Sequence, residues 1–138
     1  MVELTVDRIA YDTHHQRAII LLKHADTERY LPIVVGALEA GAIALAVEGV
    51  EAPRPQTHDL IKQILDRLEV TVNEVLIDDV RDETFFAQIS LMSGGKVVEI
   101  DSRPSDAIAL ALRAKAPIRT LERVLDLAGV TAEHGQVH

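Results

Sequence analysis

The spacing of apolar residues along the chain predicts an alternation of strands and helices. Val2, Leu4 and Val6 alternate with polar residues, which is typical of a strand with one buried face. Between 57 and 68 the apolar residues recur at spacings of three and four, which indicates a helix. The pattern predicts strands over 2–10, 17–23, 29–35, 70–77, 85–91 and 96–100, and helices over 38–47, 57–68, 104–114 and 121–128.

Proline and acidic residues interrupt this pattern at two informative places. Pro32 lies within the third strand, where its missing N–H predicts an edge position or a bulge. An acidic turn over 78–83 is expected to follow the strand at 70–77. Thr57 is expected to cap the helix that follows it.

Two alanine-rich segments share the same five residues, Ala-Ile-Ala-Leu-Ala, at 42–46 and at 107–111. Alanine is the best helix former and is depleted in strands, so both segments are predicted to be helices. Their apolar character on all sides predicts that both are largely buried. Three strands precede each segment, which favours an α+β fold built by internal duplication, with strand-strand-strand-helix-helix units over 2–68 and 70–130.

The duplicated units are expected to form one domain over 1–130, followed by a polar tail over 131–138. Each unit would contribute a hairpin-built sheet, giving two mixed or antiparallel sheets with helices packed on them. The exposed edges of such sheets need protection, and a homodimer is the simplest way to provide it.

Composition and charge narrow the function classes. The chain has no cysteine, which removes disulfides, thiolate zinc sites and cysteine nucleophiles. It shows no signal-peptide layout and no apolar run long enough for a membrane, so a cytoplasmic location without membrane contact is expected. A formal charge of −8 argues against broad, non-specific binding to nucleic acid. Any DNA or RNA would have to be held locally or through a bound cation.

The strand-to-helix corner at 101–106 concentrates polar groups beside a helix N-terminus. Asp101 and Asp106 are candidate catalytic residues and candidate oxygen ligands for a divalent cation such as Mg²⁺ or Mn²⁺. Arg103 is a candidate for catalysis and for binding a phosphate, and Ser105 for contacting substrate. The alternative is structural: Ser102 and its neighbours cap the helix, while Arg103 pairs with Asp101.

A second corner, at 53–59, holds further candidates. His58 could act as a general base or metal ligand near neutral pH, and Arg54 could bind substrate. Asp59 is a candidate metal ligand, as is Glu39 in the first turn of the first alanine-rich helix. The alternative leaves Asp59 as a cap, His58 at the surface, and Glu39 as a partner of the helix dipole.

Several phrases of the sequence resemble the bifunctional nuclease family. The matching residues are Leu31-Pro32-Ile33, Glu39-Ala40, Ala42-Ile43-Ala44, Pro53-Arg54-Pro55, Thr57-His58-Asp59-Leu60 and Ile100 through Leu110. The resemblance runs from about Leu4 to Leu125 and implies a small α+β domain. Plant members of the family are described as cutting both DNA and RNA. Where the family often has Asp-Gly-Thr-Phe, this chain has Asp82-Glu83-Thr84-Phe85.

The residues and the resemblance together favour hydrolysis of phosphodiester bonds, assisted by a divalent cation, in one cleft formed by the two corners. The acidic charge and the few candidate ligands favour a different function, a binding or oligomeric assembly module without catalysis. The two readings differ in one structural requirement, because only catalysis needs the two corners to converge.

Overall fold

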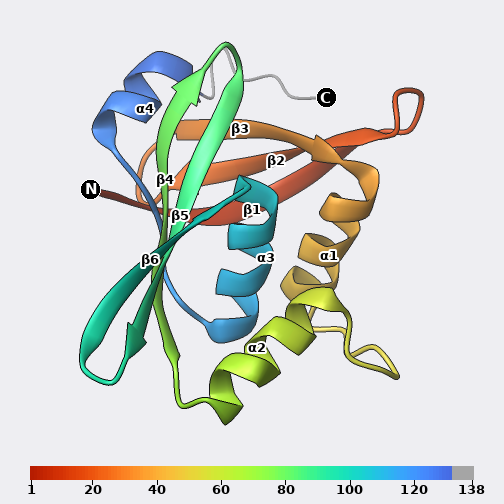
Figure 1. The fold of residues 1–138 in the computed structure, drawn as a ribbon. Coiled ribbons are helices and arrows are strands. Elements are labelled where there is room, and N and C mark those ends of the chain that lie inside the picture. The colour runs from red at the N-terminus through yellow and green to blue at the C-terminus, as the bar shows by residue number, and fades with distance from the viewer. Residues whose placement is uncertain (132–138) are drawn as a thin grey trace.

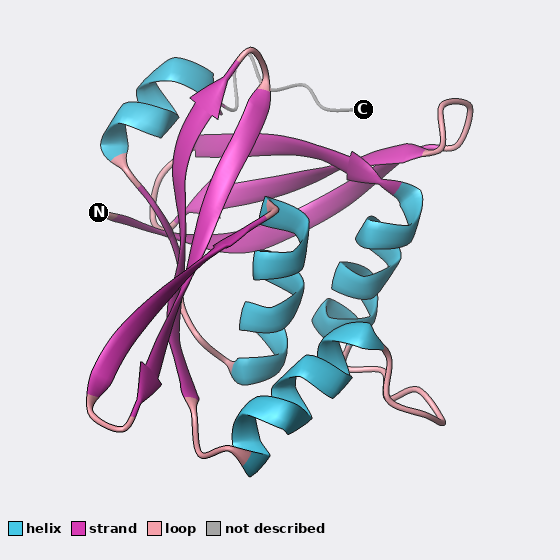
Figure 2. Cartoon of the chain, viewed as in Figure 1, coloured by secondary structure: helices cyan, strands magenta, loops and turns pink. Residues whose placement is uncertain are grey.

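The computed structural model describes residues 1–131. The elements are, in chain order, β1 (Val2–Asp12), β2 (Arg17–His24), β3 (Arg29–Gly36), α1 (Ala37–Glu48), α2 (Thr57–Arg67), β4 (Thr71–Arg81), β5 (Thr84–Ser93), β6 (Lys96–Ser102), α3 (Pro104–Ala114), β7 (Ile118–Thr120), α4 (Glu122–Ala128) and β8 (Val130–Thr131). Figures 1 and 2 show strands and helices in one α+β arrangement. None of the helices in residues 1–131 has the length and apolar content that a membrane span requires.

One curved sheet contains the eight strands of the described residues, in the order β6-β5-β4-β7-β1-β2-β3-β8. Only β4 and β7 are parallel, and the other neighbours are antiparallel. The prediction of two separate sheets is therefore wrong. The short strand β7 joins the halves, because Ile118 pairs with Leu4 of β1 on one side and with Val75 of β4 on the other.

The strand ends differ from the predicted ones in two places. Strand β4 extends to Arg81, so Asp78 and Asp79 belong to the strand and the turn contains only Asp82 and Glu83. Thr131 was assigned to the polar tail, but it pairs with Arg29 in β8. The rest of that predicted tail, 132–138, lies outside the described residues.

The position of Pro32 agrees with the prediction. Strand β3 pairs with β2 along its whole length, but among the described residues it pairs with β8 only at Arg29 and Tyr30. Pro32 lies opposite Leu21 of β2, beyond the short β8 pairing. It therefore occupies an edge segment, where a residue without an N–H removes no ladder hydrogen bond.

Helices α1 and α3 lie side by side, and α2 packs against α3 (Figure 1). Helix α3 is buried as predicted, with Ser105 and all residues from 107 to 111 inside. Helix α1 is not, because only Ala40 and Ile43 are buried and Leu38 is 89% exposed. The alanine-rich sequence thus predicted the helix correctly and overestimated how much of it is covered.

Each half of the chain begins with a three-stranded antiparallel meander followed by an alanine-rich helix. The halves then diverge, because α2 follows α1 without an intervening strand, whereas β7 separates α3 from α4. The common order of elements ends at the first helix, and the internal duplication stays a prediction.

The turn between β4 and β5 carries a strained residue. Asp82 and Glu83 both have positive φ, 49° and 66°. A two-residue hairpin turn of this kind prefers Asp-Gly, since only glycine adopts the left-handed region without strain.

We expect Glu83→Gly to raise the free energy of unfolding by about 0.5–1 kcal/mol, because the relief of backbone strain exceeds the cost of the added chain entropy. Urea unfolding measures this change. Glu83→Ala is the matched control, and equal stability of the Gly and Ala variants would contradict the strain argument.

Candidate functional site

The corner between β6 and α3 presents Arg103 and Asp106 from the start of a buried helix. Arg103 is the N-cap residue, Pro104 follows at the first helical position, and the Ala107 N–H donates to the Arg103 carbonyl at 3.0 Å. The predicted capping role of Ser102 is wrong, because its hydroxyl donates to the Arg103 carbonyl at 2.8 Å. Asp106 lies in the first turn, where the helix dipole favours a negative charge.

Two carboxylates from different helices hold the guanidinium of Arg103. Its Nε donates to Asp106 Oδ2 at 2.8 Å and its Nη2 donates to Asp106 Oδ1 at 3.1 Å. Its Nη1 donates to Glu39 Oε2, on α1, at 3.2 Å. The alternative in which Arg103 pairs with Asp101 is therefore wrong. The contact joins the starts of α1 and α3 and fixes the orientation of the arginine.

His58 reaches the same carboxylate from the start of α2. Its Nε2 lies 2.9 Å from Asp106 Oδ1, and the residue is only 8% exposed. The alternative that places His58 at the surface is therefore wrong. Its Nδ1 is buried and has no hydrogen-bond partner among the described residues. The geometry suits the tautomer in which Nε2 carries the proton and donates to Asp106.

Asp59, the next residue, points elsewhere. Its Oδ2 accepts from the Gln56 backbone N–H at 2.9 Å, and its Oδ1 accepts from Arg113 Nε at 2.7 Å. The helix therefore begins with Gln56 as the N-cap residue, and the predicted capping role of Thr57 is wrong. Asp59 stabilises the helix start and pairs with Arg113, consistent with its predicted capping role.

Arg113 was not among the predicted site residues, yet it ties three helices together. Besides its contact with Asp59, it donates to the carbonyls of Ala109 at 2.9 Å and Ala42 at 3.0 Å. Its side chain is 10% exposed. An arginine that directly follows a long apolar helical run was the one sequence signal for this role.

The cluster of Glu39, His58, Arg103 and Asp106 lines a hollow of about 670 Å³ between the three helices. A neighbouring hollow of about 350 Å³ shares Glu39 and Arg103 and adds Ser105 to its lining. The two predicted corners thus converge at one concave surface, through His58 from one and Arg103 with Asp106 from the other. The convergence that catalysis requires is present for these residues.

Three predicted residues, Asp59, Asp101 and Arg54, line neither of these two hollows. Asp101 is exposed in β6, opposite Gln88 of β5, and does not line either hollow. Arg54 is exposed in the loop before α2, where its carbonyl accepts from the Gln56 side chain at 3.3 Å. Their proposed parts in catalysis and substrate binding stay predictions.

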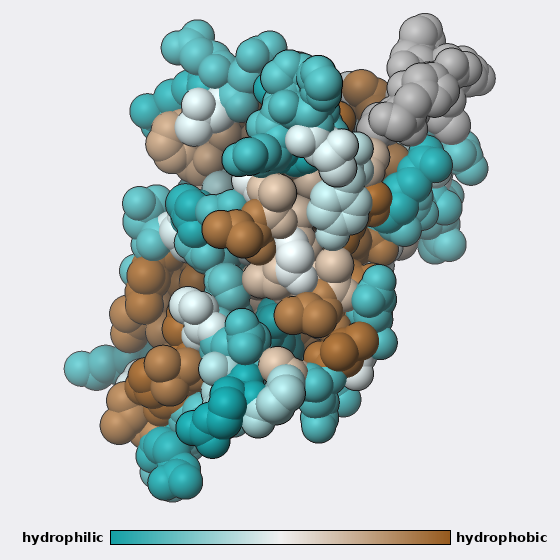
Figure 3. All heavy atoms as spheres, turned by 90° about the vertical axis from the view of Figure 1, so that its right-hand side faces the viewer, coloured by the Kyte–Doolittle hydropathy of each residue, from teal (hydrophilic) through white to brown (hydrophobic). Residues whose placement is uncertain are grey.

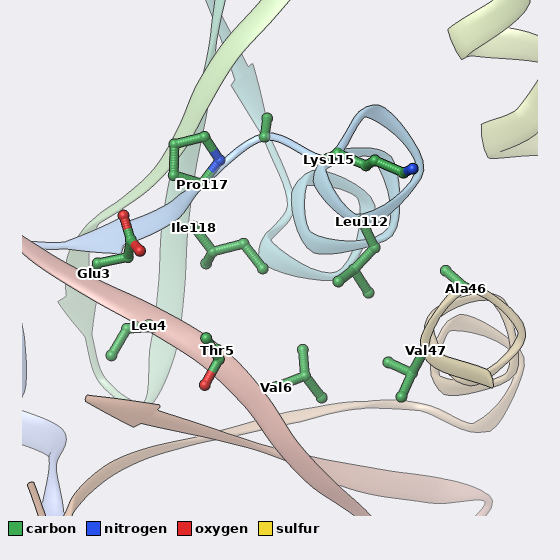
Figure 4. A pocket seen from close by; sticks show the side chains of 11 residues that line it. Glu3, Leu4, Thr5, Val6, Ala46, Val47, Leu112, Lys115, Pro117 and Ile118 are labelled. Atoms are coloured by element: carbon green, nitrogen blue, oxygen red, sulfur yellow. The ribbon is translucent and has the colours of Figure 1, made fainter. Parts of the chain in front are cut away.

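Another hollow, of about 660 Å³, lies at the opposite ends of α1 and α3 (Figure 4). Val6 of β1, Val47 of α1 and Leu112 of α3 point into the space between these elements. Glu3 and Lys115 are the charged residues of its lining. It has no counterpart of the arginine held between two carboxylates, so the chemistry favours the hollow at the helix starts.

Metal ligands are sparse. No group of three or more His, Asp or Glu side chains within residues 1–131 is placed to hold a metal ion. Glu39 and Asp106 are the carboxylates nearest to the hollow, and Arg103 lies between them. A Mg²⁺ ion commonly takes one or two protein carboxylates and completes its shell with water and substrate phosphates, which is the arrangement these residues could supply.

Hydrogen bonds from Arg103 lower the pKa of Asp106 below its ordinary value, burial opposes this shift, and the bond with His58 lowers the pKa further. A carboxyl whose pKa is lowered by folding stabilises the protein above its unfolded pKa, and this contribution is lost as pH falls through the folded pKa. We expect the free energy of unfolding to fall below about pH 4, and to fall less in Asp106→Asn. Urea unfolding between pH 7 and pH 3 compares the two proteins, and parallel curves would contradict the assignment.

Comparison with known proteins identifies relatives along most of the chain. The bifunctional nuclease domain model matches residues 20–133. An uncharacterised protein of Mycobacterium tuberculosis is 41% identical over 130 residues, covering 94% of this chain and 77% of that protein. Bifunctional nuclease 1 of Arabidopsis thaliana is 33% identical over 105 residues, covering 74% of this chain. Bifunctional nuclease 1 of Oryza sativa subsp. japonica is 28% identical over 114 residues, covering 80%.

The chain spans about a third of each plant protein, 32% of the first and 34% of the second. The matched range begins within β2 and includes β3, the four helices and the cluster at the helix starts. On this evidence the chain belongs to the bifunctional nuclease domain family.

Proposed function

We propose that this chain hydrolyses phosphodiester bonds of DNA and RNA in the hollow at the starts of α1, α2 and α3, with help from a divalent cation. The observation that supports this most directly is the convergence of Arg103, Asp106, His58 and Glu39 at one concave surface. Capping alone would not require side chains from three helices to meet. The names of the plant relatives are consistent with the same chemistry.

Arg103 is suited to binding a phosphate because its contacts leave donors unused. A guanidinium has five N–H groups, and the bonds to Asp106 and Glu39 use three of them. One N–H on each terminal nitrogen is left for a phosphate oxygen. Because the two carboxylates hold the planar group in place, the phosphate meets a donor that is already oriented.

The charge of the cluster explains the proposed need for a cation. Glu39 and Asp106 together outweigh the single positive charge of Arg103 when His58 is neutral. A phosphodiester brings a further negative charge, so its binding is opposed unless a cation offsets the carboxylates. A bound Mg²⁺ or Mn²⁺ would polarise the phosphoryl oxygens and lower the pKa of a bound water.

His58 acts in this proposal through Asp106. Its Nε2 is engaged with Asp106 and its Nδ1 is buried, so neither ring nitrogen is presented to the hollow in this state. We therefore assign it as a positioning residue that orients the carboxylate. Asp106 orients Arg103 in turn, and Glu39 supports the other terminal nitrogen of the guanidinium.

A cleavage assay tests the proposal. Purified protein is incubated with labelled single-stranded DNA and RNA in Mg²⁺ or Mn²⁺, and again after chelation. We expect strand cleavage with the metal and none after chelation, with Asp106→Asn losing the activity under both metals. Activity of equal size in Asp106→Asn would identify a contaminating nuclease and contradict the proposal.

Assembly through exposed apolar surface is a second candidate, supported by a separate set of side chains. Leu60 and Ile64 of α2 and Leu68 directly after this helix are 51%, 49% and 67% exposed. Strand β6 is an edge strand of the described sheet, and its Val97, Val98 and Ile100 are also exposed. Figure 3 shows apolar groups gathered in the lower half of the face that includes α1 and α2. Such surfaces favour contact with another protein chain.

We propose that two copies pair through β6, so that each edge strand satisfies the other by a symmetric contact. We expect analytical ultracentrifugation to show a dimer at micromolar concentration. Val98→Lys should shift the equilibrium to monomer, because a charge on an edge strand opposes strand pairing. A wild-type monomer at that concentration would overturn this proposal and leave the hydrolase proposal unaffected.

A further inference from the structure

One wall of the hollow is an apolar stripe on α1. Leu38, Gly41, Ala42 and Leu45 line it, at the i, i+3, i+4 and i+7 positions of one helix face. The opposite side carries Thr57 and His58 of α2 with Arg103 and Asp106. An apolar face is thus placed beside a phosphate-binding arginine.

Gly41 is unexpected at this position. It lies in the interior of α1, where glycine destabilises a helix by about 0.5–1 kcal/mol relative to alanine. Its backbone does not have a positive φ, and a Cβ added to it would meet no atom within 4 Å. Neither backbone conformation nor close packing explains the glycine. Its missing side chain leaves the wall of the hollow recessed.

We infer that the recess at Gly41 receives one unpaired base of a nucleic acid strand whose phosphate binds Arg103; this inference rests on the proposed function. A base offers apolar faces to the aliphatic stripe and polar edges to the opposite wall. The hollow, about 670 Å³, lies within the common range for sites of small ligands. The two N–H groups that Arg103 leaves unused favour a ligand with a phosphate, such as a nucleotide, over a purely apolar ligand.

The substrate class follows from this arrangement. A base that is stacked and paired in a duplex cannot enter a recess beside its own phosphate unless it is extruded, which requires unpairing. The site therefore selects single strands or unpaired nucleotides. A formal net charge of −8 also disfavours holding a duplex through contacts to its phosphates alone.

Gly41→Leu tests the inference by filling the recess. Binding is measured by fluorescence anisotropy in Mg²⁺ with a short single-stranded DNA carrying phosphorothioate linkages, and with a matched strand of abasic units. We expect Gly41→Leu to weaken binding of the base-containing strand by about tenfold or more and to leave the abasic strand unchanged. Ala37→Leu is the matched control, because Ala37 is exposed on the same helix and does not line the hollow.

The outcomes separate this inference from the proposed function. Unchanged binding of both strands by Gly41→Leu, or equal loss of both, overturns the base-binding recess while the hydrolase proposal stands. Wild-type protein that binds neither strand overturns both. If Gly41→Leu does not fold, the wild-type preference decides, because tighter binding of a single strand than of the same sequence as a duplex supports the inference and equal binding overturns it.

Discussion

Replacing Arg103 by lysine is expected to lower phosphodiester cleavage by about two to three orders of magnitude, the effect of removing an oriented donor from a charged transition state. Lysine keeps the positive charge but has a single nitrogen. It cannot hold Asp106 through two bonds, reach Glu39, and still present two N–H groups to a phosphate. The turnover number with single-stranded RNA in Mg²⁺ measures the effect.

A matched arginine separates this effect from a general loss of charge. Arg8 is paired only weakly, with its Nε 3.9 Å from Asp7, and lies outside the hollow. We expect Arg8→Lys to cleave at the wild-type rate. Full activity of Arg103→Lys with an unchanged melting temperature would contradict the role of the guanidinium geometry.

Replacing Arg113 by methionine is expected to lower the free energy of unfolding by about 2–4 kcal/mol. The reason is that this single change removes a nearly buried guanidinium that forms hydrogen bonds with several groups. Asp59 loses its ion pair, and the Ala42 carbonyl on α1 loses its donor. Methionine retains most of the apolar stem, so the loss reports mainly on the polar contacts. Urea unfolding at pH 7 measures it.

Arg17 provides the comparison for Arg113. Its side chain is 55% exposed and its Nε lies 3.5 Å from Asp12, and exposed pairs of this kind contribute about 0–1 kcal/mol. We expect Arg17→Met to change the unfolding free energy by less than Arg113→Met. Equal effects of the two substitutions would show that the contacts between the three helices do not depend on Arg113.

The sequence pattern predicted the long strands and the helices because each has its own periodicity. The pattern did not predict strand β7, because the three residues after Pro117 are too few to show an alternation. That short strand nevertheless turns two predicted sheets into one. The sequence pattern also did not predict that much of α1 is exposed, because an apolar sequence does not distinguish a covered helix face from the wall of a hollow.

The candidate site was predictable as two corners and not as one network. Proline and polar residues at helix starts marked His58, Arg103 and Asp106 as candidates. The pairing of Glu39 with Arg103 spans 64 positions and depends on the packing of α1 beside α3, which no local pattern contains. Asp101 shares the sequence context of Asp106, yet it lies in β6, where residues 96–101 are all exposed, and it does not line the hollow.

The most direct test of the central claim is the response of the Arg103 side chain to a phosphodiester. Nitrogen-resolved NMR of the arginine side chains follows Arg103 and Arg113 while a dinucleotide is added in Mg²⁺. We predict saturable shifts of the Arg103 signals, absent in Arg103→Lys, with the Arg113 signals unchanged. Cleavage of the dinucleotide without any shift at Arg103 would contradict the account.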